Sequence, residues 1–223
     1  MRLKHGYTNW TARSVDAVVK RYAGPDVDER RAREHAALTR LHGRLSIPRV
    51  LAFDDETLTM EFVRGRHGQE LLDEGHAREV FALCGRLLRA VQAVPADAVP
   101  ELGTPEPGQV LVHGDFGPQN LLVDPERWKP AALLDWELVR WGDPVHDLAW
   151  AEWIVRTHHP TLVDDLDAMF DAYGSRPPWE RRRRAMLDVC AWARDFVARW
   201  DDVEEGAAEL WVERTARTEA FIE

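Results

Sequence analysis

The sequence predicts an α+β protein with two lobes, a small β-rich lobe with one helix and a larger, mainly helical lobe. Two observations support this prediction. Up to about residue 63, short β-rich runs alternate with turn residues. After Gly65, apolar residues recur at the three- and four-residue spacing of helices that pack on a core. We therefore expect one lobe over residues 1–63, a second over residues 64–223, and a cleft where they meet.

In the first lobe, the expected order of elements is an opening strand within residues 1–10 that turns at Gly6, then two further strands, a helix and a hairpin. Residues 10–22 contain two β-rich runs separated by polar residues. Residues 24–44 predict a helix, because Pro25 and the aspartates after it suit a helix start and an apolar stripe follows. Residues 49–63 predict a hairpin that turns at a run of three acidic residues.

The second lobe begins with a helical pattern over residues 76–94, followed by a stretch rich in proline and glycine over residues 95–108. From residue 146 the spacing is helical again, with an interruption at residues 174–179. Four consecutive arginines, residues 181–184, fall inside the helical pattern that follows. Because acidic residues lie beside them, we expect these arginines to form a solvated face.

Charge and composition exclude several classes of protein. The 223 residues are 45% hydrophobic and 30% charged, as in an ordinary globular protein. The net charge of −10 disfavours nucleic-acid binding, because phosphates would be repelled, and mildly favours a cationic small-molecule partner. No apolar run approaches the length of a membrane span, and the N-terminus lacks the hydrophobic stretch of a signal peptide. We expect a cytoplasmic protein without a membrane or nucleic-acid partner, as a monomer or a homodimer.

The two cysteines, Cys84 and Cys190, lie in apolar, helix-like stretches and have no spacing typical of a disulfide pair or a zinc site. We expect both to be buried free thiols in a reducing compartment.

A polar loop between two apolar runs carries the strongest indication of chemistry. The stretch LVHGDFGPQNLLVD, residues 111–124, places Asp115 five residues before Asn120, and Asp135 ends the next apolar run. Phosphoryl transfer uses a carboxylate near the attacking hydroxyl and hard oxygen ligands for magnesium, and this spacing is the kinase arrangement. The alternative is an Asx-rich turn with Gly117-Pro118 at its corner. That alternative explains the loop but leaves Asp135 unexplained.

Residues 112–124 together with ALLDWELVRWGDPVHDLAW, residues 132–150, resemble the signature of the aminoglycoside phosphotransferase and choline kinase superfamily. These are small-molecule kinases with a protein-kinase-like fold. The resemblance implies that Asp115 is the catalytic base, that Asn120 and Asp135 bind Mg²⁺, that ATP is the donor and that the acceptor is a small hydroxylated molecule. It also implies that three residues support the loop and the next helix: His113, Asp143 and Asp147.

The first lobe offers a separate test of this interpretation. A kinase needs a strand lysine on the phosphates, paired with a helix glutamate, and the sequence supplies Lys20 and then Glu34. Each alone is typical of a surface charge. The stretch HGYTN, residues 5–9, resembles the family's short loop over the phosphates, which makes Gly6 and Thr8 expected nucleotide contacts.

The connector MEFVRG, residues 60–65, is expected to bind adenine through the backbone of Glu61, Phe62 and Val63. Candidates for the acceptor are Glu137 and Trp141, because carboxylates among tryptophans can enclose an ammonium group. The tryptophans that follow, Trp150 and Trp153, are expected mainly to pack helices. The segment over residues 95–110 is shorter than in many aminoglycoside enzymes, which favours a smaller acceptor or a shallow pocket.

Three function classes follow from these features. The first is an ATP-dependent phosphotransferase that acts on a hydroxyl of a small, cationic molecule such as an aminoglycoside or an amino alcohol. The second is a catalytically weak kinase fold kept for nucleotide binding or regulation. The third is a metal-dependent phosphohydrolase, suggested by His113 and the adjacent His146-Asp147. The β-rich first sixty residues speak against the third class, because such a site usually lies on an all-helical domain.

Overall fold

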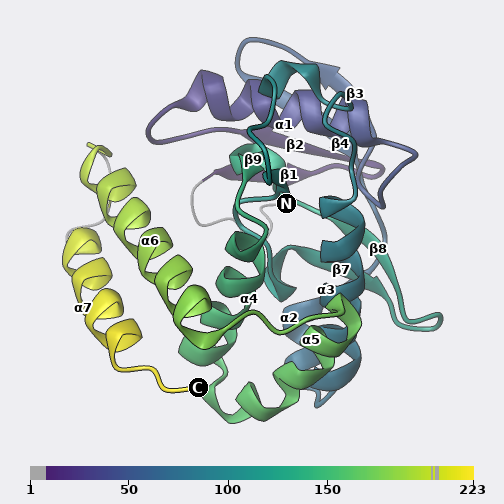
Figure 1. Ribbon diagram of the computed structural model, residues 1–223. Helices are drawn as coiled ribbons and strands as arrows, with labels where there is room; N and C mark the ends of the chain where they lie inside the picture. Colours follow the sequence, from purple (N-terminus) through teal and green to yellow (C-terminus); the bar gives the residue numbers. More distant parts are fainter. Residues whose placement is uncertain (1–8, 202, 204–205) are drawn as a thin grey trace.

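The computed structural model describes residues 9–201, 203 and 206–223. In the N-terminal part of this described chain, four strands form an antiparallel sheet in the order β1-β2-β4-β3, and helix α1 packs on the side of β3 and β4 (Figure 1). The elements are β1 (Trp10–Arg13), β2 (Ala17–Arg21), α1 (Val27–Leu41), β3 (Val50–Phe53) and β4 (Thr57–Glu61). The two strands, the helix and the hairpin expected over residues 10–63 are confirmed, whereas most of the opening strand expected within residues 1–10 lies outside the described residues.

Helix α1 is held by the apolar stripe that the sequence predicts. Ala37, Leu38 and Leu41 are fully or almost fully buried on the face turned to the core. Asp28 and Glu29 lie in its first turn, where negative charge complements the helix dipole. Three further buried positions on this helix are charged: Arg30, Arg31 and Glu34. Of these, Arg30 and Glu34 belong to the site described below.

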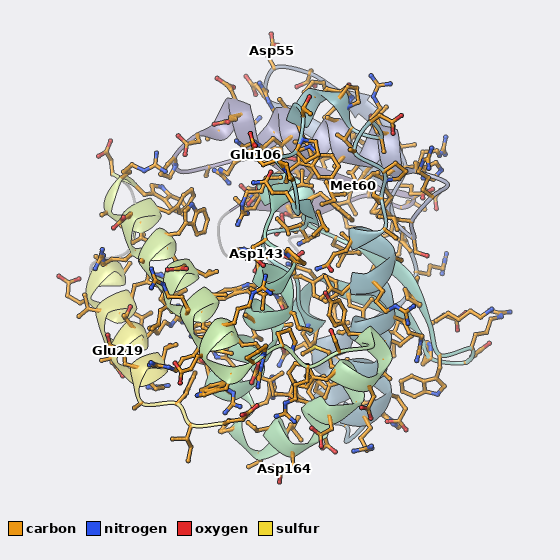
Figure 2. The ribbon with its side chains drawn as sticks, viewed as in Figure 1. Asp55, Met60, Glu106, Asp143, Asp164 and Glu219 are labelled. Atoms are coloured by element: carbon orange, nitrogen blue, oxygen red, sulfur yellow. The ribbon has the colours of Figure 1, made fainter. Side chains whose placement is uncertain are left out.

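The β3–β4 hairpin turns at the predicted acidic run. The Asp54 carboxylate accepts hydrogen bonds from the backbone N–H groups of Glu56 (2.9 Å) and Thr57 (2.8 Å), which closes the turn. Asp55, at the tip, projects away from the body of the molecule (Figure 2). The acidic run therefore serves the turn.

The helices of the C-terminal part form a layered bundle below the sheet (Figure 1). Helix α3 packs against α5, and α6 packs between α4 and α7. The elements are β5 (Arg66–His67), α2 (Gly68–Asp73), α3 (Ala77–Gln92), η1 (Pro100–Leu102), α4 (Val145–His158), η4 (Pro160–Leu166), α5 (Asp167–Tyr173), α6 (Trp179–Ala198) and α7 (Ala207–Glu219). The helical patterns and the interruption between α5 and α6 are confirmed.

Two small antiparallel sheets in the described residues carry the polar loop. Strand β6 (Val110–Val112), before the loop, pairs with β9 (Arg140–Gly142). Strand β7 (Leu121–Asp124), after it, pairs with β5 and with β8 (Lys129–Leu133). The short 3-10 helix η2 (Pro118–Asn120) leads from the polar loop into β7. A second short 3-10 helix, η3 (Trp136–Leu138), lies between β8 and β9. The strands that flank the loop thus belong to different sheets, and the loop spans the junction between them.

One apolar core runs through both parts of the molecule. It includes Leu41 and Leu58 from the N-terminal part, and Phe81, Leu88 and Leu133 from the C-terminal part. Because this core is shared by both parts, it does not mark a boundary between them, and the division of the chain into lobes at residue 63 stays a prediction. Within the described residues, no helix has both the length and the apolarity to cross a membrane.

Cys84 and Cys190 are buried free thiols, as expected. The expectation of a solvated face for residues 181–184 is wrong for one of the four arginines. Arg182 is fully buried and forms an ion pair with the equally buried Glu152. The helical period places position 182 on the same inward face as Met186 and Val189, whereas Arg181 and Arg184 point to solvent.

Candidate active site

Asp115 lies in the loop between β6 and η2 and is partly exposed. Its carboxylate is held by donors from two directions. The Asn120 side-chain amide donates to Oδ2 at 2.9 Å, and the Trp150 indole N–H donates to Oδ1 at 2.8 Å. The carboxylate of the predicted base is therefore fixed in orientation.

The surroundings of Asp115 raise its pKa to about 7. Burial contributes most, because it disfavours the charged carboxylate, and the negative charge of Asp135 adds to the effect. Hydrogen bonds from Trp150 and Asn120 work in the opposite direction, since they stabilise the charged form. A carboxyl group with a pKa near neutrality is suited to accept a proton at physiological pH.

Asn120 ends η2 and is bonded to the loop through both its side chain and its backbone. Its side-chain amide nitrogen donates to the backbone carbonyl of Asp115 at 2.8 Å as well as to the carboxylate. An ionised carboxylate only accepts hydrogen bonds, so the Asn120 amide turns its NH₂ group to Asp115 and leaves its oxygen for another partner. The backbone carbonyl of Asn120 accepts from the N–H of Leu134 at 2.8 Å, which brings Asp135 next to it.

His113 and Asp147 support the loop. The two carboxylate oxygens of Asp147, in α4, accept the backbone N–H groups of His113 (2.6 Å) and Gly114 (2.9 Å). His113 is fully buried, and its Nε2 bonds to the carbonyl of Leu134 at 2.8 Å while Nδ1 accepts the N–H of Asp115 at 3.3 Å. Burial lowers the pKa of His113, which keeps its imidazole neutral. Both ring nitrogens are thus used for support.

The second histidine of the phosphohydrolase interpretation also has a structural partner. His146 lies 2.9 Å from the Arg140 guanidinium through Nε2. Burial, followed by the positive charge of Arg140, lowers the pKa of His146 to about 4. In the described chain, the group of side chains close enough to share a metal ion consists of carboxylates. The geometry therefore favours hard oxygen ligation over a histidine-based metal centre.

Asp135 lies at the point where β8 passes into η3, in a left-handed backbone conformation with φ 66° and ψ 59°. Few residues other than glycine adopt this conformation, and such strain is concentrated at functional sites. The N–H of the next residue, Trp136, donates to Glu34 Oε1 at 3.1 Å, which ties this turn to helix α1. The strained turn directs the carboxylate of Asp135 toward Lys20, with which it forms an ion pair.

Lys20 and Glu34 form the predicted pair. Lys20 Nζ lies 2.6 Å from Glu34 Oε2, and both side chains are almost fully buried. Burial by itself would lower the pKa of Lys20. The carboxylates of Asp135, Glu137 and Glu34 outweigh burial and hold this pKa well above its usual value. Lys20 is therefore a permanent cation at the centre of the site.

Glu137 belongs to the same ion cluster. Its Oε2 lies 3.3 Å from Lys20 and 3.1 Å from Arg30, and it accepts a 2.8 Å hydrogen bond from the Asn9 side chain. Glu137 is 6% exposed, and burial raises its pKa. This position among buried cations favours a role beside Asp135 and Lys20, whereas contact of Glu137 with an acceptor stays a prediction.

Oxygen ligands for a cation converge in this cluster. One carboxylate oxygen from each of Glu34, Asp135 and Glu137 lies within 4.8 Å of the others. Glu34 already bonds Lys20, Tyr22 and the backbone of Trp136, whereas Asp135 is one-third exposed at its side chain. The donors suited to a hard divalent cation are therefore Asp135 and the side-chain oxygen of Asn120, with Glu137 beside them.

The connector after β4 contains the residues expected to bind adenine, and this role stays a prediction. The N–H of Phe62 donates to the carbonyl of Asp16 at 2.9 Å, and the Arg13 guanidinium covers its ring at 3.6 Å. Glu61 accepts the N–H of Arg49 through its side chain at 3.0 Å. The N–H of Val63 has no hydrogen-bond partner in the described part of the chain, which leaves it for a ligand.

Two of the expected nucleotide contacts, Gly6 and Thr8, lie outside the described residues. Trp141, the other expected acceptor contact, lies in β9 and donates its indole N–H to the carbonyl of Gly103 at 3.0 Å. This bond ties the segment between α3 and β6 to the loop sheet. Contact of Trp141 with an acceptor stays a prediction.

Sequence reasoning missed the site contacts of Asn9, Arg30 and Trp150. Asn9 closes the HGYTN stretch, so its place in that motif was the available signal. It accepts the N–H of Ala23 at 3.2 Å while it donates to Glu137, and thereby links the start of β1 to the ion cluster. Arg30 and Trp150 carry no local signal, because their partners are distant in the sequence.

Comparison with known families places this site in context. The model of the phosphotransferase enzyme family matches residues 2–109 and 98–187 of the chain. Among curated proteins, acyl-CoA dehydrogenase family member 10 of Mus musculus is 51% identical over 41 residues. That match covers 18% of this chain and 4% of the relative, so the chain spans only a small part of its length.

Solved structures resemble the whole chain. The GDP and kanamycin complex of APH(2")-IIia has a TM-score of 0.73 at 14% identity, over 99% of this chain and 92% of that one. Macrolide 2'-phosphotransferase MphH from Brachybacterium faecium has a TM-score of 0.68 at 20% identity, over 100% and 93%. A choline/ethanolamine kinase family protein from Mesorhizobium loti has a TM-score of 0.69 at 19% identity, over 99% of this chain and 86% of that one. At these identities the likeness is one of fold, and it confirms the expected kinase-like fold class.

Proposed function

The chain belongs to the phosphotransferase enzyme family, and from this membership and the geometry of the site we propose that it is a small-molecule kinase. It transfers the γ-phosphate of ATP to a hydroxyl group of a small acceptor. The observation that carries the proposal is the convergence of four residues from three separate segments: Asp115 and Asn120 from the loop between β6 and β7, Asp135 from the turn after β8, and Lys20 from β2. These are the parts that phosphoryl transfer requires.

On the donor side, residues 1–63 bind the nucleotide. Lys20, fixed by Glu34, neutralises negative charge on the phosphates. The backbone between Glu61 and Val63 binds adenine, and the N–H of Val63, which has no hydrogen-bond partner among the described residues, supports this assignment. Gly6 and Thr8 would contribute to the loop over the phosphates.

Asp135 and the side-chain oxygen of Asn120 would hold Mg²⁺, and the chemistry of this donor set fits that hard cation. When bound, Mg²⁺ neutralises phosphate charge and orients the β- and γ-phosphates. Lys20 forms an ion pair with Asp135 in the structure, so nucleotide binding exchanges part of this contact for contacts with phosphate.

On the acceptor side, residues 64–223 present Asp115 to the attacking hydroxyl. The hydroxyl oxygen forms a bond with the γ-phosphorus, the bond to the β–γ bridging oxygen breaks, and ADP leaves with that electron pair. The hydroxyl proton passes to the Asp115 carboxylate. The pKa of about 7 at Asp115 matches this role at neutral pH.

A cationic acceptor is favoured by the net charge of −10. The neighbours' names point to the same range of acceptors: kanamycin, streptomycin and gentamicin complexes, a macrolide phosphotransferase and a choline/ethanolamine kinase family protein. We propose an aminoglycoside-type or amino-alcohol acceptor, in a cytoplasmic monomer or homodimer without a nucleic-acid or membrane partner.

The alternative is a kinase fold that binds nucleotide but transfers phosphate weakly. All five key polar residues are present. Lys20 contacts both Glu34 and Asp135, and Asp115 is hydrogen-bonded to Asn120, so each of the five has a partner among the others, which disfavours this alternative. Tight nucleotide binding without phosphate transfer to any of the tested acceptors would favour this alternative.

The test is ADP release from Mg²⁺-ATP across a panel of hydroxylated acceptors: aminoglycosides, macrolides, choline, ethanolamine, other amino alcohols and sugars. The matched controls are Asp115→Ala and Asp135→Ala. We expect acceptor-dependent turnover in the wild type, loss of transfer with retained nucleotide binding in Asp115→Ala, and weaker Mg²⁺-nucleotide binding in Asp135→Ala. Full turnover in Asp115→Ala would show that the assigned base is wrong.

A further inference from the structure

Trp150 makes a polar contact that helix packing does not require. It lies in α4, is 8% exposed, and its indole N–H donates to Asp115 Oδ1 at 2.8 Å. Asp115 lies 35 positions earlier in the chain, in a different element. A buried indole that only filled space could direct its N–H to any nearby acceptor, whereas this one reaches the carboxylate assigned as the base.

The ring of Trp150 is held rigidly. It stacks on Trp153 with ring centroids 4.4 Å apart and an interplanar angle of 11°, and Trp211 of α7 continues the stack. Trp153 is fixed in turn, because its indole N–H donates to the Thr218 hydroxyl at 2.7 Å. The donor that faces Asp115 is therefore positioned by two helices, α4 and α7.

The hydrogen bond acts on a torsion that is otherwise soft. Rotation of an aspartate carboxylate about its last bond has a broad energy profile, so the group turns unless donors hold it. Trp150 holds Oδ1 from α4, and Asn120 holds Oδ2 from η2. Gln119 approaches Oδ1 at a longer 3.4 Å. With Trp150 and Asn120 in place the carboxylate plane is fixed, and Oδ2, which has one donor, keeps a lone pair for a hydroxyl.

We propose that Trp150 is a positioning residue for phosphoryl transfer, which orients the Asp115 carboxylate toward the acceptor hydroxyl through its indole N–H. This inference rests on the proposed function. It assigns to Trp150 a role in the rate of transfer rather than in the binding of either substrate.

The decisive comparison is Trp150→Phe against Trp153→Phe. Each variant removes one indole N–H and leaves a smaller ring in the same stack on the same helix, but only the first removes the donor to Asp115. We expect Trp150→Phe to lower kcat about tenfold to a hundredfold, the loss typical of a misplaced reacting group. The KM values for ATP and acceptor should stay within about threefold. Trp153→Phe keeps an aromatic ring in the stack and keeps the Trp150 N–H on Asp115, so its loss of kcat should be clearly smaller than that of Trp150→Phe.

A double-variant cycle separates positioning from a general structural effect. If Trp150 acts through Asp115, Trp150→Phe has no further effect on the residual rate of Asp115→Ala. An equal loss of kcat in Trp150→Phe and Trp153→Phe, or the same fold-loss from Trp150→Phe with and without the Asp115 carboxylate, would overturn the proposal.

A measurement without turnover distinguishes failure of this proposal from failure of the proposed function. In ¹H–¹⁵N spectra, the indole resonances of Trp150 and Trp153 are assigned by their absence in the two phenylalanine variants. In Asp115→Ala the Trp150 indole proton should move strongly and that of Trp153 should not. If the wild type phosphorylates no acceptor, the proposed function fails. If the Trp150 resonance does not move, the contact is absent and the positioning role is wrong.

Discussion

Asp115 combines a raised pKa with two hydrogen bonds that stabilise its charged form. The rise follows from burial and from the nearby charge of Asp135, and it brings the pKa to about 7. The base must be ionised to accept a proton. The catalytically competent fraction is therefore complete above this pKa and is lost as the pH falls through it.

We therefore expect kcat/KM to be constant above about pH 8 and to fall about tenfold per pH unit below about pH 6. The measurement is a pH profile of kcat/KM in the wild type, with enzyme stability checked at each pH. A profile that stays flat down to about pH 5 would show that a group other than Asp115 limits the rate, or that no base is required.

Lys20 balances three carboxylates, of which Glu34 and Glu137 are buried, and this makes it important for stability as well as for phosphate binding. Lys20→Met leaves these charges without their main partner. We expect a loss of about 3–5 kcal/mol in the free energy of unfolding at pH 7. Part of the loss should disappear at lower pH, because protonation of the carboxylates removes the unpaired charge.

Thermal unfolding of Lys20→Met at pH 5 and pH 7 measures both effects. The matched control is Lys129→Met, which removes an exposed lysine of β8 and should leave the melting temperature nearly unchanged at both pH values. Equal melting temperatures of wild type and Lys20→Met would contradict the ion cluster.

At the scale of single residues, the sequence predicted those site residues whose spacing is set by local structure. Asp115 and Asn120 share one loop, and Lys20 and Glu34 lie on adjacent elements. The roles of Arg30 and Trp150 depend on contacts over more than 30 positions, which no local pattern records. The burial of Glu137 was missed for the same reason.

At the scale of elements, the catalytic loop is fixed by one carboxylate at the start of a helix. Asp147, in the first turn of α4, accepts the N–H groups of His113 and Gly114. Gly114 has φ 89°, and a Cβ atom there would lie 2.5 Å from the Leu138 carbonyl oxygen. The loop therefore requires both a glycine and an acceptor beneath it.

Asp147→Ala leaves two buried N–H groups without acceptors. Because each costs about 1–3 kcal/mol, we expect a loss of about 2–6 kcal/mol in the free energy of unfolding together with loss of transfer. Asp147→Asn keeps one acceptor oxygen and should give an intermediate loss. Chemical denaturation of the two variants measures the difference. Wild-type stability in Asp147→Ala would mean that the loop is held by other contacts.

The helices, strands and hairpin were predictable because apolar periodicity and turn residues are local. The separation of β6 and β7 into different sheets was not, since strand pairing is decided by distant partners. Helix α6 shows the same limit. Its helical pattern was clear, but the buried pair of Arg182 with Glu152 depends on α4, a different element.

At the scale of the whole molecule, the end of α6 contacts the loop before α1. Trp200 packs against Gly24, and the Arg199 guanidinium pairs with Asp26 through two hydrogen bonds. The Arg30 guanidinium lies over the Phe196 ring, with its Cζ atom 5.4 Å from the ring centroid. Since α1 carries Glu34, this contact links the C-terminal helices to the ion cluster of the site.

Gly24 is the critical residue of this contact. It has φ 83°, and a Cβ atom there would lie 2.9 Å from the Trp200 ring. We expect Gly24→Ala to lower the melting temperature and to weaken nucleotide binding. Arg199→Ala should have a small effect, because the pair is exposed. The measurement is thermal unfolding of both variants with and without Mg²⁺-ATP. A larger decrease in melting temperature in Arg199→Ala than in Gly24→Ala would contradict this account.

The central claim is that Asp115 accepts the proton of an acceptor hydroxyl while phosphate passes from ATP to that oxygen. The most direct test is mass-spectrometric detection of the phosphorylated acceptor with wild type and Asp115→Ala, at equal nucleotide saturation. The account predicts acceptor-dependent product with wild type and its near-complete loss in the variant. Product formed equally by both proteins, or no Mg²⁺-dependent nucleotide binding by the wild type, would contradict it.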